Sequence, residues 1–139
     1  NRFYQPDINL ETLAVEPKLQ LSTAYESLLS IRWIAMLFGK VNLDLAATGG
    51  MHSAEEVLKA ILSGASVTYL CSVLLLHGPR HVETILQNVM DWMEEHDYNS
   101  VSQLQGSLCQ QRAVNPEGYE RSNYIDVLNS YSAAPGVWR

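Results

Sequence analysis

The feature that most constrains the fold is an alternation of helical and strand patterns, with short loops between them, in the middle of the chain. A helix is expected over 24–38, because apolar residues recur there at helical spacing and Gly39 follows where a C-cap glycine would lie. A short strand is expected over 41–47, where apolar and polar residues alternate. The chain then enters a loop at Thr48-Gly49-Gly50.

The second half of the alternation begins with a helix that carries a capping box. Ser53 and Glu56 have the three-residue spacing at which each side chain bonds the backbone of the other. Gly64 is expected to end this helix, and 67–70 is a compact β-prone run. A long helix should open at 77–79, which contains a proline, and run to about Asn99.

This order of elements predicts an α/β fold. Short loops between alternating helices and strands imply parallel strands joined by right-handed crossovers. Two strands cannot complete such a sheet, and a closed barrel of this kind typically needs roughly 250 residues. We therefore expect the C-terminal portion of a TIM (β/α)8 barrel, about its last two strands with their helices, with the missing part upstream.

The flanking segments are less regular. Residues 1–23 suit a long connection with a strand or hairpin piece. A short helix is expected over 101–108, and a second helical pattern over 117–131, followed by a loose tail. Four residues share one face of that second pattern, and we interpret them as packing rather than chemistry. They are Tyr124, Ile125, Leu128 and Tyr131.

Composition excludes several classes of function. The 139 residues are 47% hydrophobic, enough to bury a core, and the net charge of −6 leaves no basic surface for nucleic acid. No apolar run approaches the roughly 20 residues of a membrane span. The two cysteines form no CxxC or Cys/His cluster, which predicts a cytoplasmic protein without a structural metal.

Two short motifs at neighbouring strand ends predict a phosphate site. Thr48, Gly49 and Gly50 end one strand, and Cys71 and Ser72 end the next. In (β/α) barrels a phosphate is frequently held by the loops after two adjacent strands. Glycine lets backbone N–H groups approach phosphate oxygens closely, and the two hydroxyls can add hydrogen bonds.

Ordinary structural roles compete with this interpretation. The glycine pair would also suit a plain turn, Ser72 a helix N-cap, and Cys71 a buried thiol with no base beside it. We interpret His52 as a solvated loop residue rather than an acid or a phosphate donor. His77 and His81 lack a third ligand for a metal.

The motifs taken in order resemble the flavin-phosphate segment of dihydroorotate dehydrogenases. That family has Gly-Thr-Gly-Gly, a helix ending in Cys-Gly-Ala-Ser, a strand ending in Gly-Thr, and a Glu-Gly-Pro helix entry. Their counterparts here are 47–50, 63–66, 71–72 and 77–79. The resemblance covers about residues 1–108, which leaves 109–139 as a helical extension and tail.

The resemblance implies an FMN-dependent oxidoreductase of pyrimidine biosynthesis that oxidises dihydroorotate or a related small molecule. The backbone amides of Gly49, Gly50, Cys71 and Ser72 would grip the FMN phosphate, and Asn1 is similar to an asparagine that contacts the substrate ring. In the family a catalytic Cys or Ser base and a lysine near the flavin lie upstream of this segment. The expected partners are the rest of the barrel and further copies in a homo-oligomer.

Two departures from the family bear on the substrate. Cys71 replaces the family's glycine, and 21–24 replaces its glycine-rich loop, so the substrate is expected to differ. Two further functions stay open from the sequence. One is a flavin-free barrel enzyme that acts on a phosphorylated metabolite, and the other is a non-catalytic barrel remnant that serves as a structural or interaction module.

Overall fold

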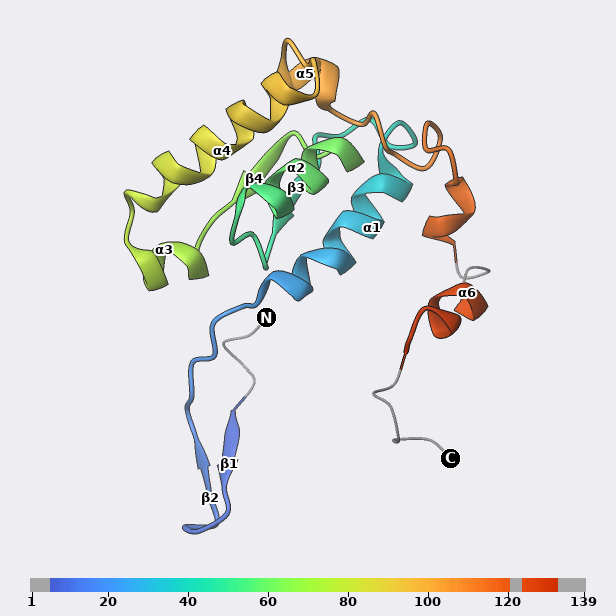
Figure 1. Cartoon of the computed structure of the whole chain (residues 1–139). Coiled ribbons are helices and arrows are strands. Elements are labelled where there is room, and N and C mark those ends of the chain that lie inside the picture. Colours follow the sequence, from blue (N-terminus) through green and yellow to red (C-terminus); the bar gives the residue numbers. More distant parts are fainter. Residues whose placement is uncertain (1–5, 121–123, 133–139) are drawn as a thin grey trace.

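The computed structural model describes residues 6–120 and 124–132, and it opens with a β-hairpin. Strand β1 (Asp7–Asn9) pairs antiparallel with β2 (Ala14–Glu16), and the hairpin extends away from the helices (Figure 1). The Asn9 side chain closes it by donating to Glu16 Oε1 at 2.7 Å. The hairpin expected before residue 24 is thus confirmed, although its side chains contribute nothing to the core.

The first long helix has the predicted position. A 3-10 turn, η2 (Ala24–Glu26), leads into α1 (Ser27–Leu37), and Gly39 follows its end. The turn is capped because the Thr23 N–H donates to the Glu26 carboxylate at 2.8 Å. Helix α1 buries only one side, which carries Ile34 and Ala35.

Strands β3 (Ala46–Thr48) and β4 (Val67–Tyr69) form a parallel pair in which Ala47 lies opposite Thr68. The first strand begins at residue 46 and not at 41, because β4 offers only three residues for pairing. The upstream residues that alternate, Val41 and Leu43, are exposed instead.

Helix α2 (Ala54–Ser63) connects the two parallel strands, and its capping box is confirmed. The Ser53 N–H donates to Glu56 Oε2 at 2.8 Å, and Ser53 Oγ accepts from the Glu55 N–H at 3.1 Å. Gly64 ends the helix as predicted.

Three helices follow β4. Helix α3 (Ser72–His77) occupies an apolar run for which the sequence predicted no helix, and α4 (His81–Glu95) starts after the proline turn. Helix α4 is long and is followed by the short α5 (Val101–Leu104) (Figure 1). The long helix therefore begins later than predicted, because α3 takes up the preceding residues.

The core consists of two clusters that share helix α2. One cluster lies among α2, α3, α4 and α5, and the other lies among α1, β3 and α2. The first contains Ala54, Val57, Leu58, Leu62, Val73, Ile85, Val89 and Leu104. The second contains Ile34, Ala47, Met51, Ala60 and Ala65.

The chain after α5 runs back across the helices. The Leu108 N–H donates to Leu62 O and the Gln110 N–H to Ala35 O, and Cys109 between them is buried. Two short helices follow, η3 (Pro116–Tyr119) and α6 (Tyr124–Asn129). The four apolar residues of the α6 stripe are 53% to 75% exposed, so the packing expected for them is not seen among the described residues.

The described chain is thus an α/β arrangement with two two-stranded sheets and no closed barrel. The parallel sheet has one covered and one open face, since the side chains of Ala46, Thr48, Val67 and Tyr69 are exposed. Within residues 6–120 and 124–132, no helix is both long and apolar enough to cross a membrane.

Candidate functional site

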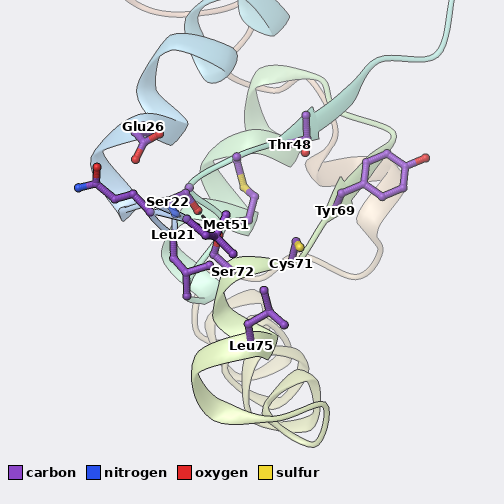
Figure 2. Close-up of a pocket in the computed structure, with 13 residues that line it drawn as sticks. Leu21, Ser22, Glu26, Thr48, Met51, Tyr69, Cys71, Ser72 and Leu75 are labelled. Carbon is purple, nitrogen blue, oxygen red and sulfur yellow. Dashed lines mark hydrogen bonds between the residues drawn. The ribbon is translucent and has the colours of Figure 1, made fainter. Parts of the chain in front are cut away.

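A pocket of about 580 Å³ opens where β3 and β4 end (Figure 2). It is lined by the segment before η2, the loop after β3, and the turn between β4 and α3. All five residues predicted to hold a phosphate line it, so the two strand ends do meet at one site. The lining residues are Leu19, Gln20, Leu21, Ser22, Glu26, Thr48, Gly49, Gly50, Met51, Tyr69, Cys71, Ser72 and Leu75.

The two glycines have different roles in the backbone. Both have positive φ, +82° at Gly49 and +75° at Gly50, a region that residues with a Cβ rarely adopt. A Cβ on Gly50 would lie 2.4 Å from Ser27 N and 2.9 Å from Thr23 O, so this residue packs against the start of α1. A Cβ on Gly49 would meet no atom within 4 Å. Gly50 therefore holds the loop against the start of α1, and Gly49 leaves its backbone accessible from the pocket.

A polar cluster forms one wall of the pocket. Ser22 donates to Ser72 Oγ twice, from its N–H at 3.1 Å and from its hydroxyl at 2.8 Å. Ser22 Oγ also lies 3.2 Å from His52 Nε2. Only Ser72 was predicted as part of this site, and Ser22 was missed.

Three sequence interpretations are corrected here. His52 is half-buried and bonded to Ser22, so it is not a solvated loop residue, because the segment before η2 folds over it. The N-cap position of α3 is held by Cys71, so Ser72 does not cap the helix. Cys71 itself is exposed in the pocket and not buried, because no element of the described chain covers the open face of the sheet.

The remaining walls are mostly apolar and carry little charge. Leu21, Met51 and Leu75 provide apolar surface, and Met51 is almost fully buried. Glu26 is the one charged lining residue in the described chain, and its carboxylate accepts from the Thr23 N–H. Since no Lys or Arg among the described residues lines the pocket, an anion bound there would rely on backbone N–H groups and hydroxyls.

The donor set fits a phosphate group on a larger, partly apolar ligand. The volume lies within the range of about 300–1,000 Å³ typical of cofactor sites. No backbone acceptor among the described residues pairs with the Gly50 N–H. A Cβ on Gly49 would meet no atom within 4 Å, so a ligand can approach its backbone. Asn1, predicted to contact substrate, lies outside the described residues, and those residues contain no cluster of three or more potential metal ligands.

The fold and the pocket define a class: an α/β protein with a ligand pocket at the carboxyl ends of two parallel strands. No family model matches the chain. Curated relatives nevertheless confirm the resemblance of this chain to the dihydroorotate dehydrogenase family, over about half of the chain's own length.

A quinone-dependent dihydroorotate dehydrogenase from Trichodesmium erythraeum is 33% identical over 67 residues, 48% of this chain and 18% of the relative. The catalytic subunit of dihydroorotate dehydrogenase B (NAD(+)) from Pelobacter propionicus is 32% identical over 79 residues, 57% of this chain and 26% of the relative. The chloroplastic dihydropyrimidine dehydrogenase (NADP(+)) of Arabidopsis thaliana is 26% identical over 67 residues, 48% of this chain and 16% of the relative. The chain thus matches about a quarter or less of the length of these relatives.

Proposed function

We propose that this chain supplies the FMN phosphate site of an oxidoreductase similar to dihydroorotate dehydrogenase. The observation that carries the proposal is the meeting of Gly49 and Gly50 from one strand end with Cys71 and Ser72 from the next in a single pocket. The relatives support it, because dihydroorotate and dihydropyrimidine dehydrogenases are all redox enzymes acting on reduced pyrimidines.

The residues of the pocket would bind and orient the cofactor. The amides of Gly49, Gly50 and Cys71 and the hydroxyls of Thr48 and Ser72 would hold the phosphate, while the apolar walls limit the access of water. When bound, FMN supplies a hydride acceptor for a small-molecule substrate such as dihydroorotate. The chain's own contribution is positioning, since a fixed phosphate fixes the distance from cofactor to substrate.

The barrel itself is part of the proposal. The open sheet face, with Thr48, Val67 and Tyr69, has the exposure expected of an inner barrel face whose packing partners are side chains of the other barrel strands. Residues 1–108 would be its C-terminal portion and 109–139 an extension. The catalytic base, the lysine near the flavin and the role of Asn1 stay predictions, as do the homo-oligomer and the cytoplasmic location.

Colour and cofactor analysis of the purified full chain, meaning this segment together with the rest of the proposed barrel, test this function. We expect a yellow protein that releases FMN on denaturation. Ser72→Ala should weaken FMN binding by about tenfold or more, because hydrogen bonds to charged groups contribute roughly 1.5–3 kcal/mol. The matched control is Ser102→Ala, at an exposed position of α5, which should bind FMN as the wild type does.

The other outcomes separate the alternatives. A colourless protein that binds phosphate esters would replace the flavoenzyme by a flavin-free barrel enzyme. A protein that binds neither flavin nor phosphate esters would leave a non-catalytic module.

A further inference from the structure

The hydrogen bonds at Ser72 bear on whether its hydroxyl donates to a pocket ligand or accepts from it. A serine hydroxyl has two acceptor lone pairs and one proton to donate. Ser72 Oγ accepts from both the N–H and the hydroxyl of Ser22, at 3.1 and 2.8 Å. In the arrangement in which Ser22 donates both hydrogen bonds, both lone pairs of Ser72 Oγ are in use and its proton is left to donate. Since Ser72 lines the pocket, its hydroxyl is a donor for a pocket ligand.

The same count of donors and acceptors, applied to Ser22, bears on the tautomer of His52. The Ser22 hydroxyl gives its proton to Ser72, so it can only accept from the imidazole nitrogen 3.2 Å away. In that arrangement Nε2 of His52 carries the hydrogen, and this tautomer is part of the inference drawn below. The three groups form one directed chain, from His52 Nε2–H to Ser22 Oγ–H to Ser72 Oγ–H.

A directed chain of this kind transmits charge. Each hydrogen bond polarises the next, so a donor at one end is strengthened by a cation at the other. Ser22 is 9% exposed, which keeps water from competing at the centre of the chain. A protonated His52 would make the Ser72 hydroxyl a stronger donor to an anion, and an anion in the pocket would in turn favour the protonated imidazole.

The other titratable groups of the pocket and of the start of α2 leave His52 as the source of positive charge. Glu26 on η2 lines the pocket and accepts from Thr23, and Tyr69 and Cys71 line it from β4 and the turn after it. At the start of α2, Glu56 accepts from Ser53 and Glu55 pairs with Lys59, the only cation among these groups. That lysine is on the exposed side of α2 and is already paired with a carboxylate.

We propose that His52 is a pH-dependent positioning residue that acts through Ser22 and Ser72 on a phosphate monoester bound in the pocket. The inference rests on the proposed function in taking that phosphate as the one of FMN. Affinity for the phosphate is higher when the imidazole carries a positive charge, so we expect it to fall as pH rises.

The test compares FMN affinity of the full chain and of His52→Gln between about pH 5.5 and 8.5. Glutamine retains an N–H donor but cannot become charged. The phosphate of FMN itself gains charge near pH 6, and taking the ratio of the two affinities at each pH cancels that change. We expect the wild type to bind about fivefold tighter at low pH, with a ratio near one at high pH. A ratio that does not vary with pH would overturn the proposal.

Two controls locate the effect. His96→Gln changes an exposed histidine at the far end of α4 and should leave the profile of the wild type unchanged. In a Ser22→Ala background, His52→Gln should have no further effect on the profile. Persistence of its full effect there would mean that His52 acts through space, and would reject the chain of hydrogen bonds.

The tautomer of His52 can be measured on the wild type, so this test does not depend on whether a variant folds. Nitrogen-15 spectra of the histidine rings report which nitrogen carries hydrogen, and above neutral pH we expect Nε2–H for His52. A ring protonated only on Nδ1 would reject the proposed direction.

Failure of this inference is distinguishable from failure of the proposed function. Riboflavin, which lacks the phosphate, should show a ratio that does not change with pH. If FMN binds and its ratio is also flat, only the role of His52 fails. If no flavin binds, the same titration with inorganic phosphate still tests His52, and a ratio that varies with pH would support its role while the flavin assignment is rejected.

Discussion

The two faces of the β3–β4 sheet are formed by alternate residues of the same two strands, and different constraints act on them. On the covered face Ala47 is fully buried against α1 and α2, in a cluster with Met51 and Ala60. On the open face Val67 and Tyr69 are 43% and 59% exposed. The covered face is determined by packing, and the fully buried Ala47 there is small and apolar. The open face has no such requirement, and the pocket residues lie where it ends.

The sharpest test of this difference uses the two neighbouring glycines. Gly50→Ala should destabilise the protein by about 4 kcal/mol, because positive φ costs roughly 1–2 kcal/mol and the Cβ would overlap Ser27 N. Gly49→Ala should cost only about 1 kcal/mol, since it meets the backbone penalty alone. Urea denaturation measures both. Equal losses would mean that Gly50 does not pack as described.

A pair of leucines should show the next largest effect. Leu104 is fully buried in the cluster of α2, α3, α4 and α5, and Leu104→Ala should cost about 3 kcal/mol. Leu75 is 66% exposed beside the pocket, and Leu75→Ala should cost less than about 0.5 kcal/mol. The urea midpoints of the two variants compare them. A large loss at Leu75 would indicate that another element covers the open side.

The cap of helix α2 tests the covered face through the helix that packs on it. Ser53→Ala removes the acceptor of the Glu55 N–H and should lower the free energy of unfolding by about 1 kcal/mol. Ser102→Ala, at an exposed serine, is the matched control and should change it by less than about 0.3 kcal/mol. Thermal melting curves suffice, and indistinguishable melting temperatures would contradict the cap.

The smallest effect concerns the solvent side of the same helix. The hydrogen bond from Lys59, and then its charge, lower the pKa of the Glu55 carboxyl. Because the folded pKa lies below the unfolded one, the pair stabilises the fold above the unfolded pKa, and this contribution is lost as pH falls through the folded value. Lys59→Met should return the pKa to its ordinary range, as carbon-13 NMR titration of the carboxyl would report. A pKa that stays low would assign the shift to the helix N-terminus instead.

Local signals explain how much of the fold could be predicted. The helices ended by Gly39 and Gly64 and the capping box at Ser53 depend on neighbours within a few residues, so the sequence contains their cause. The start of β3 was placed at 41 because alternation alone does not reveal whether a partner strand is long enough. Helix α3 was missed because a short apolar run does not distinguish a strand from a buried helix.

The residues of the site also divide into those with a local signal in the sequence and those that depend on long-range contacts. Five of the pocket residues were predicted from motifs at the ends of strands, where chain order implies position. Ser22 was missed because its partner Ser72 lies 50 residues away, and no local pattern records that contact. The exposure of Cys71 and the partial burial of His52 also depend on which segments fold over them, so composition and spacing could not give them.

Amide spectra of the full chain test most directly whether the two strand ends hold one phosphate. Nitrogen-15 correlation spectra would be recorded with FMN and with riboflavin, which differ only in the phosphate group. We predict that the differences in amide shift between the two concentrate at Gly49, Gly50, Cys71 and Ser72. Differences confined to other parts of the chain, or affecting only one of the two strand ends, would contradict a shared phosphate site.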